Sequence, residues 1–208
     1  MIKNAVFDFG QVMVQFEPSY MVSKYVFDSA DAALLEKIVF DRLYWDKLDA
    51  GTITDSEVVA ACCQRLPERL HASAELIYYN WIYNIPEIEG MRQLVADIKK
   101  DLGVRVFLLS NISTYFADHS NEIPCLSEFE KCIFSAVCGY TKPRCEIFAH
   151  LCEECGIIPE ETVFIDDSEK NIKGAEAFGI KGYLFDGDIE KLRSYLYGTI
   201  KKNWKNSL

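Results

Sequence analysis

The stretch Ala5-Val6-Phe7-Asp8-Phe9-Gly10-Gln11-Val12 places a single carboxylate at the end of an apolar run. The apolar residues before it predict a buried β-strand over residues 2–8. Ligands in an open parallel sheet bind beyond the carboxyl ends of the strands. Asp8 is therefore expected at the edge of an active site, with Gly10 two residues beyond it.

Three later apolar segments also end in polar residues, and they predict strands over residues 104–109, 132–137 and 162–166. The polar residues that follow them are Ser110-Asn111, Lys142-Pro143 after Gly139, and Asp166-Asp167. If the strands are parallel, an aspartate, a serine, a lysine and an acidic pair converge on one rim of the sheet. This combination suits a phosphate group and a divalent cation.

Helical segments alternate with these strands. Helices are expected over residues 88–102, 144–155 and 170–178, and a last strand over residues 181–185. Such alternation predicts an α/β fold with a doubly wound parallel sheet. Apolar residues at helical spacing follow from Ile189 to Ile200, and the end of the chain, with Lys201, Lys202 and Lys205, is expected to be solvated.

The block between Phe16 and Pro86 contains no convincing strand. Its periodicity predicts four helices, over residues 19–28, 30–43, 54–66 and 71–84, and Thr54-Asp55-Ser56-Glu57 is a capping-box signature for the third. Trp45 is expected at the head of a polar loop between the second and third helices. We therefore predict a helical cap domain of residues 16–86, inserted by hinges near residues 15 and 87 into a core domain of residues 1–15 and 87–208.

The four polar sites, taken in order, resemble the motifs of the haloacid dehalogenase superfamily of hydrolases: Asp8 the first, Ser110 the second, Lys142 the third and Asp166-Asp167 the fourth. The resemblance covers nearly the whole chain, since one subgroup of the family carries a helical cap where residues 16–86 fall. The start Asp8-Phe9-Gly10-Gln11 is similar to the Asp-x-Gly-Asn of bacterial sugar-phosphate phosphatases, including α-glucose-1-phosphate phosphatases. A Rossmann-like core and phosphatase chemistry are implied.

The resemblance also implies a role for each motif. Asp8 would attack phosphorus and form an aspartyl phosphate, while Lys142 would balance the negative charge beside it. Ser110 and the main-chain amide of Asn111 would bind phosphoryl oxygens. Mg²⁺ would be held by Asp8, the main-chain carbonyl of Gly10 and Asp167, with Asp166 acting through water. Asn171 would either hydrogen-bond Lys142 or the acidic pair, or cap a helix.

Gly10 departs from the family pattern. Most phosphatases of the superfamily place a second aspartate there, which protonates the leaving oxygen and then activates water, and such help is worth roughly 10² to 10⁴ in rate. An anomeric sugar oxygen leaves more readily than an ordinary alkoxide, so the glycine favours sugar 1-phosphates or other activated esters. Gln11 is too weak a base to replace a carboxylate, which leaves the hydrolysis of the aspartyl phosphate unassigned.

Three function classes remain. The favoured one is a Mg²⁺-dependent phosphatase acting on a small phosphorylated metabolite, for instance a hexose 1-phosphate, with Trp45 of the cap touching the substrate beyond its phosphate. The second is a 2-haloacid dehalogenase-type hydrolase, which also uses an aspartate nucleophile but needs no Mg²⁺, so Asp166-Asp167 argue against it. The third is a catalytically inactive member that binds or regulates.

Composition narrows the partners and the compartment. The net charge of -10 disfavours nucleic acid and anionic membranes, because both select basic surfaces. No apolar stretch is long enough for a membrane span, and Lys3, Asn4 and Asp8 interrupt any signal sequence, so a cytoplasmic protein is expected. Of the eight cysteines, Cys62-Cys63 are adjacent and Cys152-Glu153-Glu154-Cys155 lacks a second pair at metal spacing. Small buried hydrophobes are therefore expected rather than disulfides or a zinc site.

Overall fold

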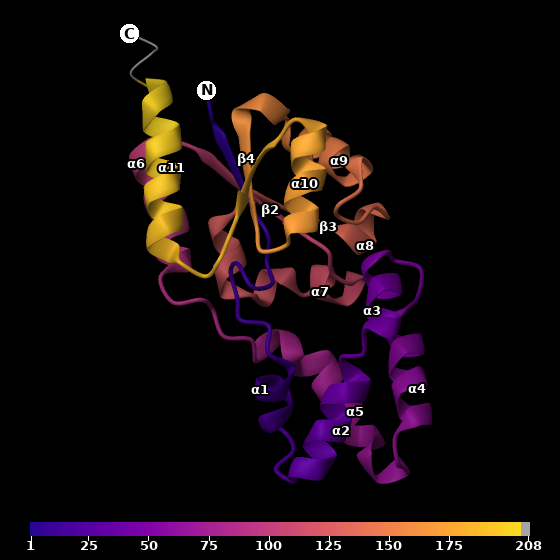
Figure 1. Cartoon of the computed structure of the whole chain (residues 1–208). Helices are drawn as coiled ribbons and strands as arrows, with labels where there is room; N and C mark the ends of the chain where they lie inside the picture. The colour runs from indigo at the N-terminus through magenta and orange to yellow at the C-terminus, as the bar shows by residue number, and fades with distance from the viewer. Residues whose placement is uncertain (205–208) are drawn as a thin grey trace.

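The computed structural model describes residues 1–204, with side chains as far as residue 200. The expected solvated end with Lys201, Lys202 and Lys205 lies outside the described side chains. Five parallel strands form one sheet in the order β3-β2-β1-β4-β5, with β1 at its centre (Figure 1). The strands are β1 (Asn4–Phe7), β2 (Arg105–Ser110), β3 (Lys131–Phe134), β4 (Thr162–Asp166) and β5 (Lys181–Leu184). The predicted parallel α/β fold is confirmed.

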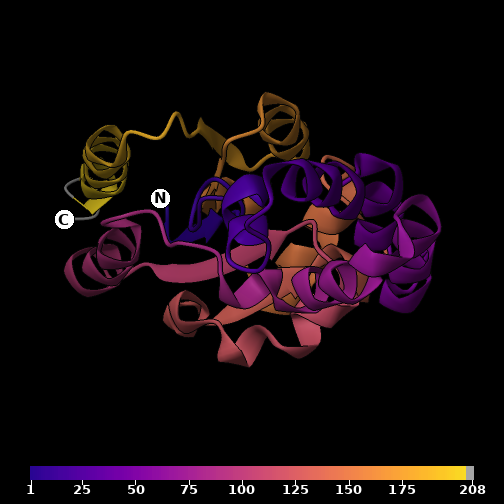
Figure 2. The same ribbon diagram turned by 90° about the horizontal axis from the view of Figure 1, so that it is seen from below.

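Helices cover both faces of the sheet. The first face carries α6 (Met91–Leu102) and α11 (Ile189–Trp204), and the second carries α9 (Cys145–Cys155) and α10 (Glu169–Phe178) (Figures 1 and 2). Ala5 and Phe7 of β1 belong to the apolar cluster under α6 and α11, while Val6 belongs to the cluster under α9 and α10. Side chains alternate across a strand, so a strand buried on both faces needs a continuous apolar sequence.

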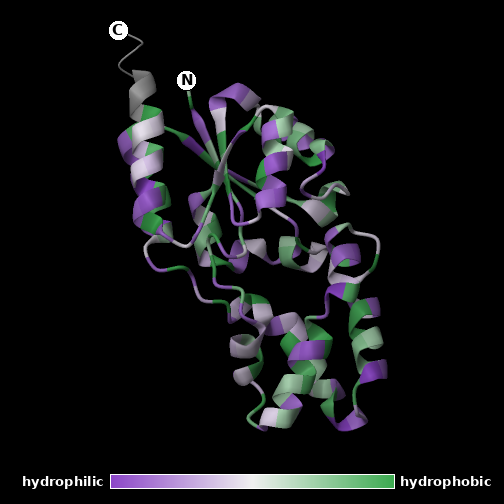
Figure 3. Ribbon diagram, in the orientation of Figure 1, coloured by the Kyte–Doolittle hydropathy of each residue, from purple (hydrophilic) through white to green (hydrophobic). Residues whose placement is uncertain are grey.

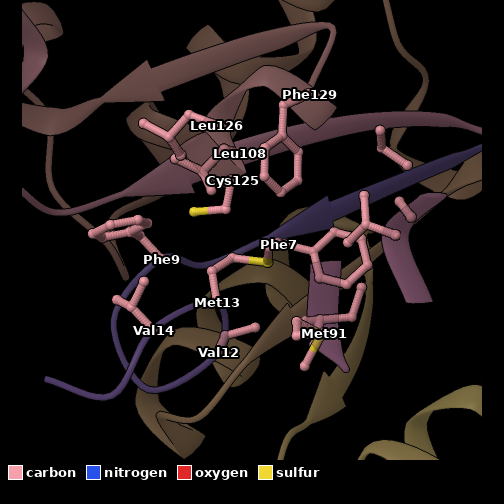
Figure 4. Packing of buried hydrophobic residues seen from close by; sticks show 14 of the residues in the cluster. Phe7, Phe9, Val12, Met13, Val14, Met91, Leu108, Cys125, Leu126 and Phe129 are labelled. Carbon is pink, nitrogen blue, oxygen red and sulfur yellow. The ribbon is translucent and has the colours of Figure 1, made fainter. Parts of the chain in front are cut away.

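The loop after β1 is anchored by its apolar side chains. In Figure 4, Phe9 and Met13 lie in the same packed cluster as Phe7, together with Cys125 and Phe129. All five side chains are buried. Burial of these anchors fixes the loop that carries Asp8 and Gly10.

The segment from Pro18 to Asn80 forms five helices around a separate apolar cluster. In Figure 3, hydrophobic and hydrophilic segments alternate along α2, α4 and α5, as expected of helices with one apolar face. The five are α1 (Pro18–Ser23), α2 (Ser29–Val39), α3 (Arg42–Asp49), α4 (Asp55–Arg65) and α5 (His71–Asn80). The capping box at Thr54 is present, with Glu57 as its partner.

The predictions of four helices and of a polar loop after Trp45 are wrong, because Asp41 begins an additional helix inside the expected helix over residues 30–43. Asp28 accepts hydrogen bonds from the main chain of Ala30 and Asp31 and starts α2 at Ser29, close to the predicted start at residue 30, whereas the helix expected over residues 19–28 ends at Ser23. Asp41 accepts one from Leu43 and starts α3, which contains Trp45. Asp at an N-cap satisfies otherwise unpaired N–H groups, and this outweighs the continuous apolar pattern.

The two connections between this helical segment and the sheet pair with each other. The N–H of Gln15 donates to Pro86 O at 2.8 Å, and the N–H of Ile88 donates to Met13 O at 2.9 Å. These bonds lie beside the positions where hinges are expected. The division into a core of residues 1–15 and 87–208 and a cap of residues 16–86 stays a prediction.

The expected strand over residues 132–137 is too long. β3 ends at Phe134 because β2, its partner in the described sheet, ends opposite it at Ser110, and the chain then turns into α8 (Ser135–Cys138). The expected helix over residues 88–102 begins only at Met91, after Gly90, whose φ of 83° marks the turn into α6. A short helix α7 (Thr114–Asp118) follows β2, and the 3₁₀ turns are Glu68–Leu70, Trp81–Tyr83, Ser120–Glu122, Pro124–Glu128 and Pro159–Glu161.

All eight cysteines lie in the described part of the chain and are free thiols. Cys125, Cys155 and Cys62 are each buried in a different one of the three apolar clusters, as small hydrophobic side chains. Within residues 1–204, no helix combines the length and the apolar character that crossing a bilayer requires.

Gly174 of α10 provides a test of how tightly this helix packs on the loop after Lys142. A Cβ at Gly174 would lie 2.4 Å from the carbonyl oxygen of Pro143, whereas one at Gly198 of α11 meets no described atom within 4 Å. We expect Gly174→Ala to lower the free energy of unfolding by about 1–3 kcal/mol through overpacking. The control Gly198→Ala should raise it by about 0.5–1 kcal/mol, since alanine favours the helix. Urea unfolding measures both, and equal stability of the two variants would contradict the packing.

Candidate active site

Asp8 stands where β1 ends between its two neighbours. Its main-chain N–H donates to Ile165 O on β4 at 2.9 Å, and its Oδ1 accepts from the N–H of Phe9 at 2.7 Å. The register pairs Phe7 with Leu108 of β2 and with Ile165 of β4. Ser110 lies two residues after Leu108 and Asp166 directly follows Ile165, so both reach the same rim, as the sequence predicts.

Lys142 links two carboxylates at this rim. Its Nζ lies 2.7 Å from Asp8 Oδ1 and 2.7 Å from Asp166 Oδ2, and all three residues are buried. Burial by itself would lower the pKa of Lys142, but the carboxylates of Asp8 and Asp166 raise it above its ordinary value. Burial raises the pKa of Asp8, and the charge of Lys142 opposes that rise. The ammonium form of Lys142 is thus held beside Asp8.

Two asparagines hold this arrangement in place. The side chain of Asn111 accepts from the N–H of Lys142 at 2.8 Å and donates to Lys142 O at 3.1 Å. Asn171 Nδ2 lies 3.0 Å from both carboxylate oxygens of Asp166. Asn171 is therefore bound to the acidic pair and does not cap α10, whose N-cap is Ser168. The clamp by the Asn111 side chain was not predicted, because it joins residues 31 positions apart.

Three carboxylates gather around this point. Oxygens of Asp8, Asp166 and Asp167 all lie within 4.8 Å of one another. Burial, followed by the charge of Asp166, raises the pKa of Asp167, so the cluster resists carrying its full negative charge. Hard oxygen donors of this kind are the ligands that Mg²⁺ prefers. The donor set fits a divalent cation, and the role of these residues as metal ligands stays a prediction.

A cavity of about 680 Å³ opens over the rim. Ser110, Asn111, Lys142, Asp8 and Asp167 all line it, so the structure brings the predicted core residues to one place. Gly10 lines it as well, and a Cβ there would meet no heavy atom within 4 Å. The core side of the cavity thus has open space where the family resemblance implies a second aspartate.

The opposite wall of the cavity comes from α3. Arg42, Trp45, Asp46 and Asp49 all line it, and their spacing puts them on one face of the helix. Only Trp45 was predicted from the sequence. Asp46 and Asp49 were missed because their segment was expected to be a loop, and Arg42 because it lay at the end of the expected helix over residues 30–43; the spacing of three and four residues was a readable signal.

Trp45 is buried, with 9% of its surface exposed, in an aromatic cluster with Phe16, Phe40 and Trp81. Its Nε1–H donates to Val39 O at 3.2 Å. Part of the ring reaches the cavity, and the rest joins the helical segment to the core. The role of Trp45 in binding a substrate stays a prediction.

Asp49 is the last residue of α3 and is tied to the core through its main chain. Its carbonyl accepts from Ser135 Oγ at 2.6 Å. Burial raises the pKa of its carboxyl to about 7, with Arg42 and Lys142 opposing the rise and Asp46 adding to it. Asp49 is thus a half-buried carboxyl that faces the same cavity as Asp8.

Comparison with known proteins agrees with this geometry. Residues 2–179 match the haloacid dehalogenase-like hydrolase family. A curated relative, the D-ribitol-5-phosphate phosphatase of Bacteroides thetaiotaomicron, is 29% identical over 196 residues, which cover 88% of this chain and 91% of the relative. The similarity to α-glucose-1-phosphate phosphatases stays a prediction.

Two solved structures share the fold. A haloacid dehalogenase family enzyme of Bacteroides thetaiotaomicron, in complex with magnesium and inorganic phosphate, is 23% identical, with a TM-score of 0.64 over 90% of this chain and 96% of that one. The L-2-haloacid dehalogenase of Xanthobacter autotrophicus is 16% identical, with a TM-score of 0.66 over 88% of this chain and 76% of that one. The match over residues 2–179, which carries all four motifs in order, shows that this chain belongs to the haloacid dehalogenase-like hydrolase family.

Proposed function

We propose that this protein is a Mg²⁺-dependent phosphatase that hydrolyses a small phosphate monoester through an aspartyl phosphate. The observation that supports this most is the buried Asp8–Lys142–Asp166 ion pair with Asp167 beside it, at the floor of the cavity. A nucleophilic carboxylate, a fixed positive charge and further acidic groups are what phosphoryl transfer to an aspartate requires.

Each residue of the rim takes one task. Asp8 attacks phosphorus, Lys142 offsets the negative charge that gathers there, and Ser110 with the main-chain N–H of Asn111 binds phosphoryl oxygens. Asp8, Asp167 and the main-chain carbonyl of Gly10 would hold Mg²⁺, with Asp166 acting through water. The ion, when bound, draws negative charge from the phosphoryl group.

The substrate class we propose is a sugar or polyol phosphate. The cavity is much larger than a phosphate group needs. The wall opposite the rim combines aromatic rings with the polar side chains of α3. Such a surface suits a hydroxylated carbon chain or ring. The curated relative that is a ribitol-phosphate phosphatase supports this class, and the leaving-group argument from Gly10 favours hexose 1-phosphates within it.

The alternative of a dehalogenase is kept open by the shared fold but is disfavoured by the acidic cluster. Phosphatases and dehalogenases of this family both carry an aspartate nucleophile and a lysine. Three carboxylates within 4.8 Å of one another suit a site that also binds a cation. A hydrolase that needs no metal has no use for this concentration of charge.

Metal dependence and the nucleophile can be tested together. Purified protein should release p-nitrophenol from p-nitrophenyl phosphate with Mg²⁺ and lose this activity on chelation, regaining it when Mg²⁺ is restored. Asp8→Asn should reduce turnover to background, because an amide does not attack phosphorus. Asp118→Asn, which removes an exposed carboxylate of α7 outside the cavity, is the control and should behave as the parent.

Two outcomes would count against the proposal. Activity that survives chelation would favour the metal-independent reading, and 2-haloacids would then be the substrates to assay. Turnover retained by Asp8→Asn would remove Asp8 from the role of nucleophile.

The substrate-facing role of Trp45 gives a second test. Trp45→Leu should raise the KM for the best sugar phosphate from a screen while changing p-nitrophenyl phosphate turnover little. This is expected when a lost contact stabilises the bound substrate and the transition state equally. Phe40→Leu is the matched control, because Phe40 packs on Trp45 but does not line the cavity. It should lower stability without raising KM. Equal effects of the two variants on KM would assign Trp45 to packing alone.

The same screen tests the leaving-group argument from Gly10, which predicts faster turnover of hexose 1-phosphates than of hexose 6-phosphates. Equal rates for the two would refute that argument.

A further inference from the structure

The proposed function leaves one chemical task without a residue. Phosphoryl transfer to Asp8 requires a proton for the leaving oxygen, and hydrolysis of the aspartyl phosphate requires a base for water. Position 10 carries no carboxylate, and Lys142 is committed to Asp8 and Asp166. If the proposed function holds, another residue of the cavity must supply this group.

We propose that Asp49, carried into the cavity by α3, is the catalytic acid and base of the phosphatase reaction. It would provide from the helical segment what a carboxylate at position 10 would provide from the core. Asp49 lines the same cavity as Asp8, Gly10 and Lys142.

The position of Asp49 relative to the core is fixed by contacts of its main chain. Ser135 Oγ donates to Asp49 O at 2.6 Å and accepts from the N–H of Ile112 at 2.9 Å. Ile112 follows directly on Ser110-Asn111, so one hydroxyl joins α3 to the loop that would bind phosphate. A Cβ at Gly51 would lie 2.6 Å from Ala136 O, which requires a glycine at this close approach. Figure 1 shows α3 beside α8 at this junction.

The surroundings of Asp49 suit a group that gives and takes a proton. The charged groups that act on it are Arg42 and Asp46 on α3 and Lys142 across the cavity, while α8, which packs beside α3, carries no charged side chain. Burial is the largest influence on its carboxyl and raises its pKa to about 7. A carboxyl that titrates near neutral pH can serve in both protonation states.

The chemistry balances in two steps. In the first, a carboxylate oxygen of Asp8 forms a bond to phosphorus, the bond from phosphorus to the leaving oxygen breaks, and the proton of Asp49 moves to that oxygen. In the second, a water oxygen attacks phosphorus, one water proton moves to Asp49, and the bond from phosphorus to Asp8 breaks. Inorganic phosphate leaves, and both aspartates return to their starting states.

Asp49→Asn tests the second step directly. Asparagine has nearly the same size as aspartate, and the main-chain carbonyl that accepts from Ser135 Oγ is unchanged. p-Nitrophenol leaves without help, so the variant should still form the aspartyl phosphate but hydrolyse it slowly. We expect a burst approaching one p-nitrophenol per enzyme, then a steady rate lower than that of the parent by about 10²- to 10⁴-fold. Mass spectrometry of the quenched protein should show one added phosphoryl group.

Asp46→Asn is the matched control, because it removes a carboxylate from the same helix face and cavity wall. This variant should show no burst and no accumulated phosphoenzyme. A burst in both variants would point to a general effect of charge rather than to Asp49. An Asp49→Asn variant that turns over at the parent's rate without a burst would overturn the inference and leave the proposed phosphatase intact. A parent without phosphatase activity would instead refute the proposed function.

A second variant tests whether position 10 and Asp49 are equivalent. Adding Gly10→Asp to Asp49→Asn should raise the steady rate at least tenfold above that of Asp49→Asn alone. Position 10 can take the side chain, since no heavy atom lies within 4 Å of a Cβ there and Gly10 is not among the residues with positive φ. Failure of the double variant to recover any activity, with its fold intact by circular dichroism, would contradict the assigned role.

The pH dependence of stability gives a readout that is independent of catalysis. The carboxyl of Asp49 holds its proton more tightly in the folded protein, where its pKa is about 7, than at its ordinary value of 3.8. The parent should therefore lose stability as pH rises between about 4 and 7, relative to Asp49→Asn, which does not titrate there. The difference in the free energy of unfolding should then level off above pH 7. A difference that stays constant with pH would show that Asp49 is solvated and would overturn the inference.

Discussion

The ion pair of Lys142 with Asp8 and Asp166 is the constraint on which the site depends. Two carboxylates at the ends of neighbouring strands would repel each other in a buried setting, and the ammonium group 2.7 Å from each offsets this. Removing one partner of a buried pair typically costs about 3–5 kcal/mol, because a buried charge is left without compensation. The clamp by Asn111, the contacts of Asn171 and the close approach of Gly174 to Pro143 all hold this lysine or its partner in place.

The cavity joins two parts of the chain with different tasks. The rim of the sheet carries the groups to which we assign phosphoryl transfer, and these depend on strand ends that the parallel register aligns. The face of α3 lines the opposite wall of the cavity, where we propose that it meets the rest of the substrate, and its position depends on the Ser135 hydroxyl and on the aromatic cluster around Trp45. In our proposal, a change in the helical segment can therefore alter substrate choice and proton transfer without disturbing the nucleophile.

The errors in the sequence-based description share a cause. The apolar pattern predicts one continuous helix over residues 30–43, while capping by Asp41 divides it into α2 and α3. β3 is shorter than its apolar sequence because β2 offers no further backbone partner. In each case a local hydrogen-bonding group or the length of a neighbouring strand outweighs the hydrophobic period, and neither can be read from periodicity.

The sequence by itself determined the parallel α/β fold, the positions of the strand ends and the gathering of Asp8, Ser110, Lys142 and Asp166-Asp167, because alternating strands and helices bring polar residues at strand ends to one rim. Only the tertiary structure decided which face of α3 meets that rim and that Asp49 belongs to the cavity. The bond from Ser135 to Asp49 spans 86 positions, and the clamp of Asn111 on Lys142 spans 31. No local pattern encodes such contacts, since they depend on how the helical segment packs on the sheet.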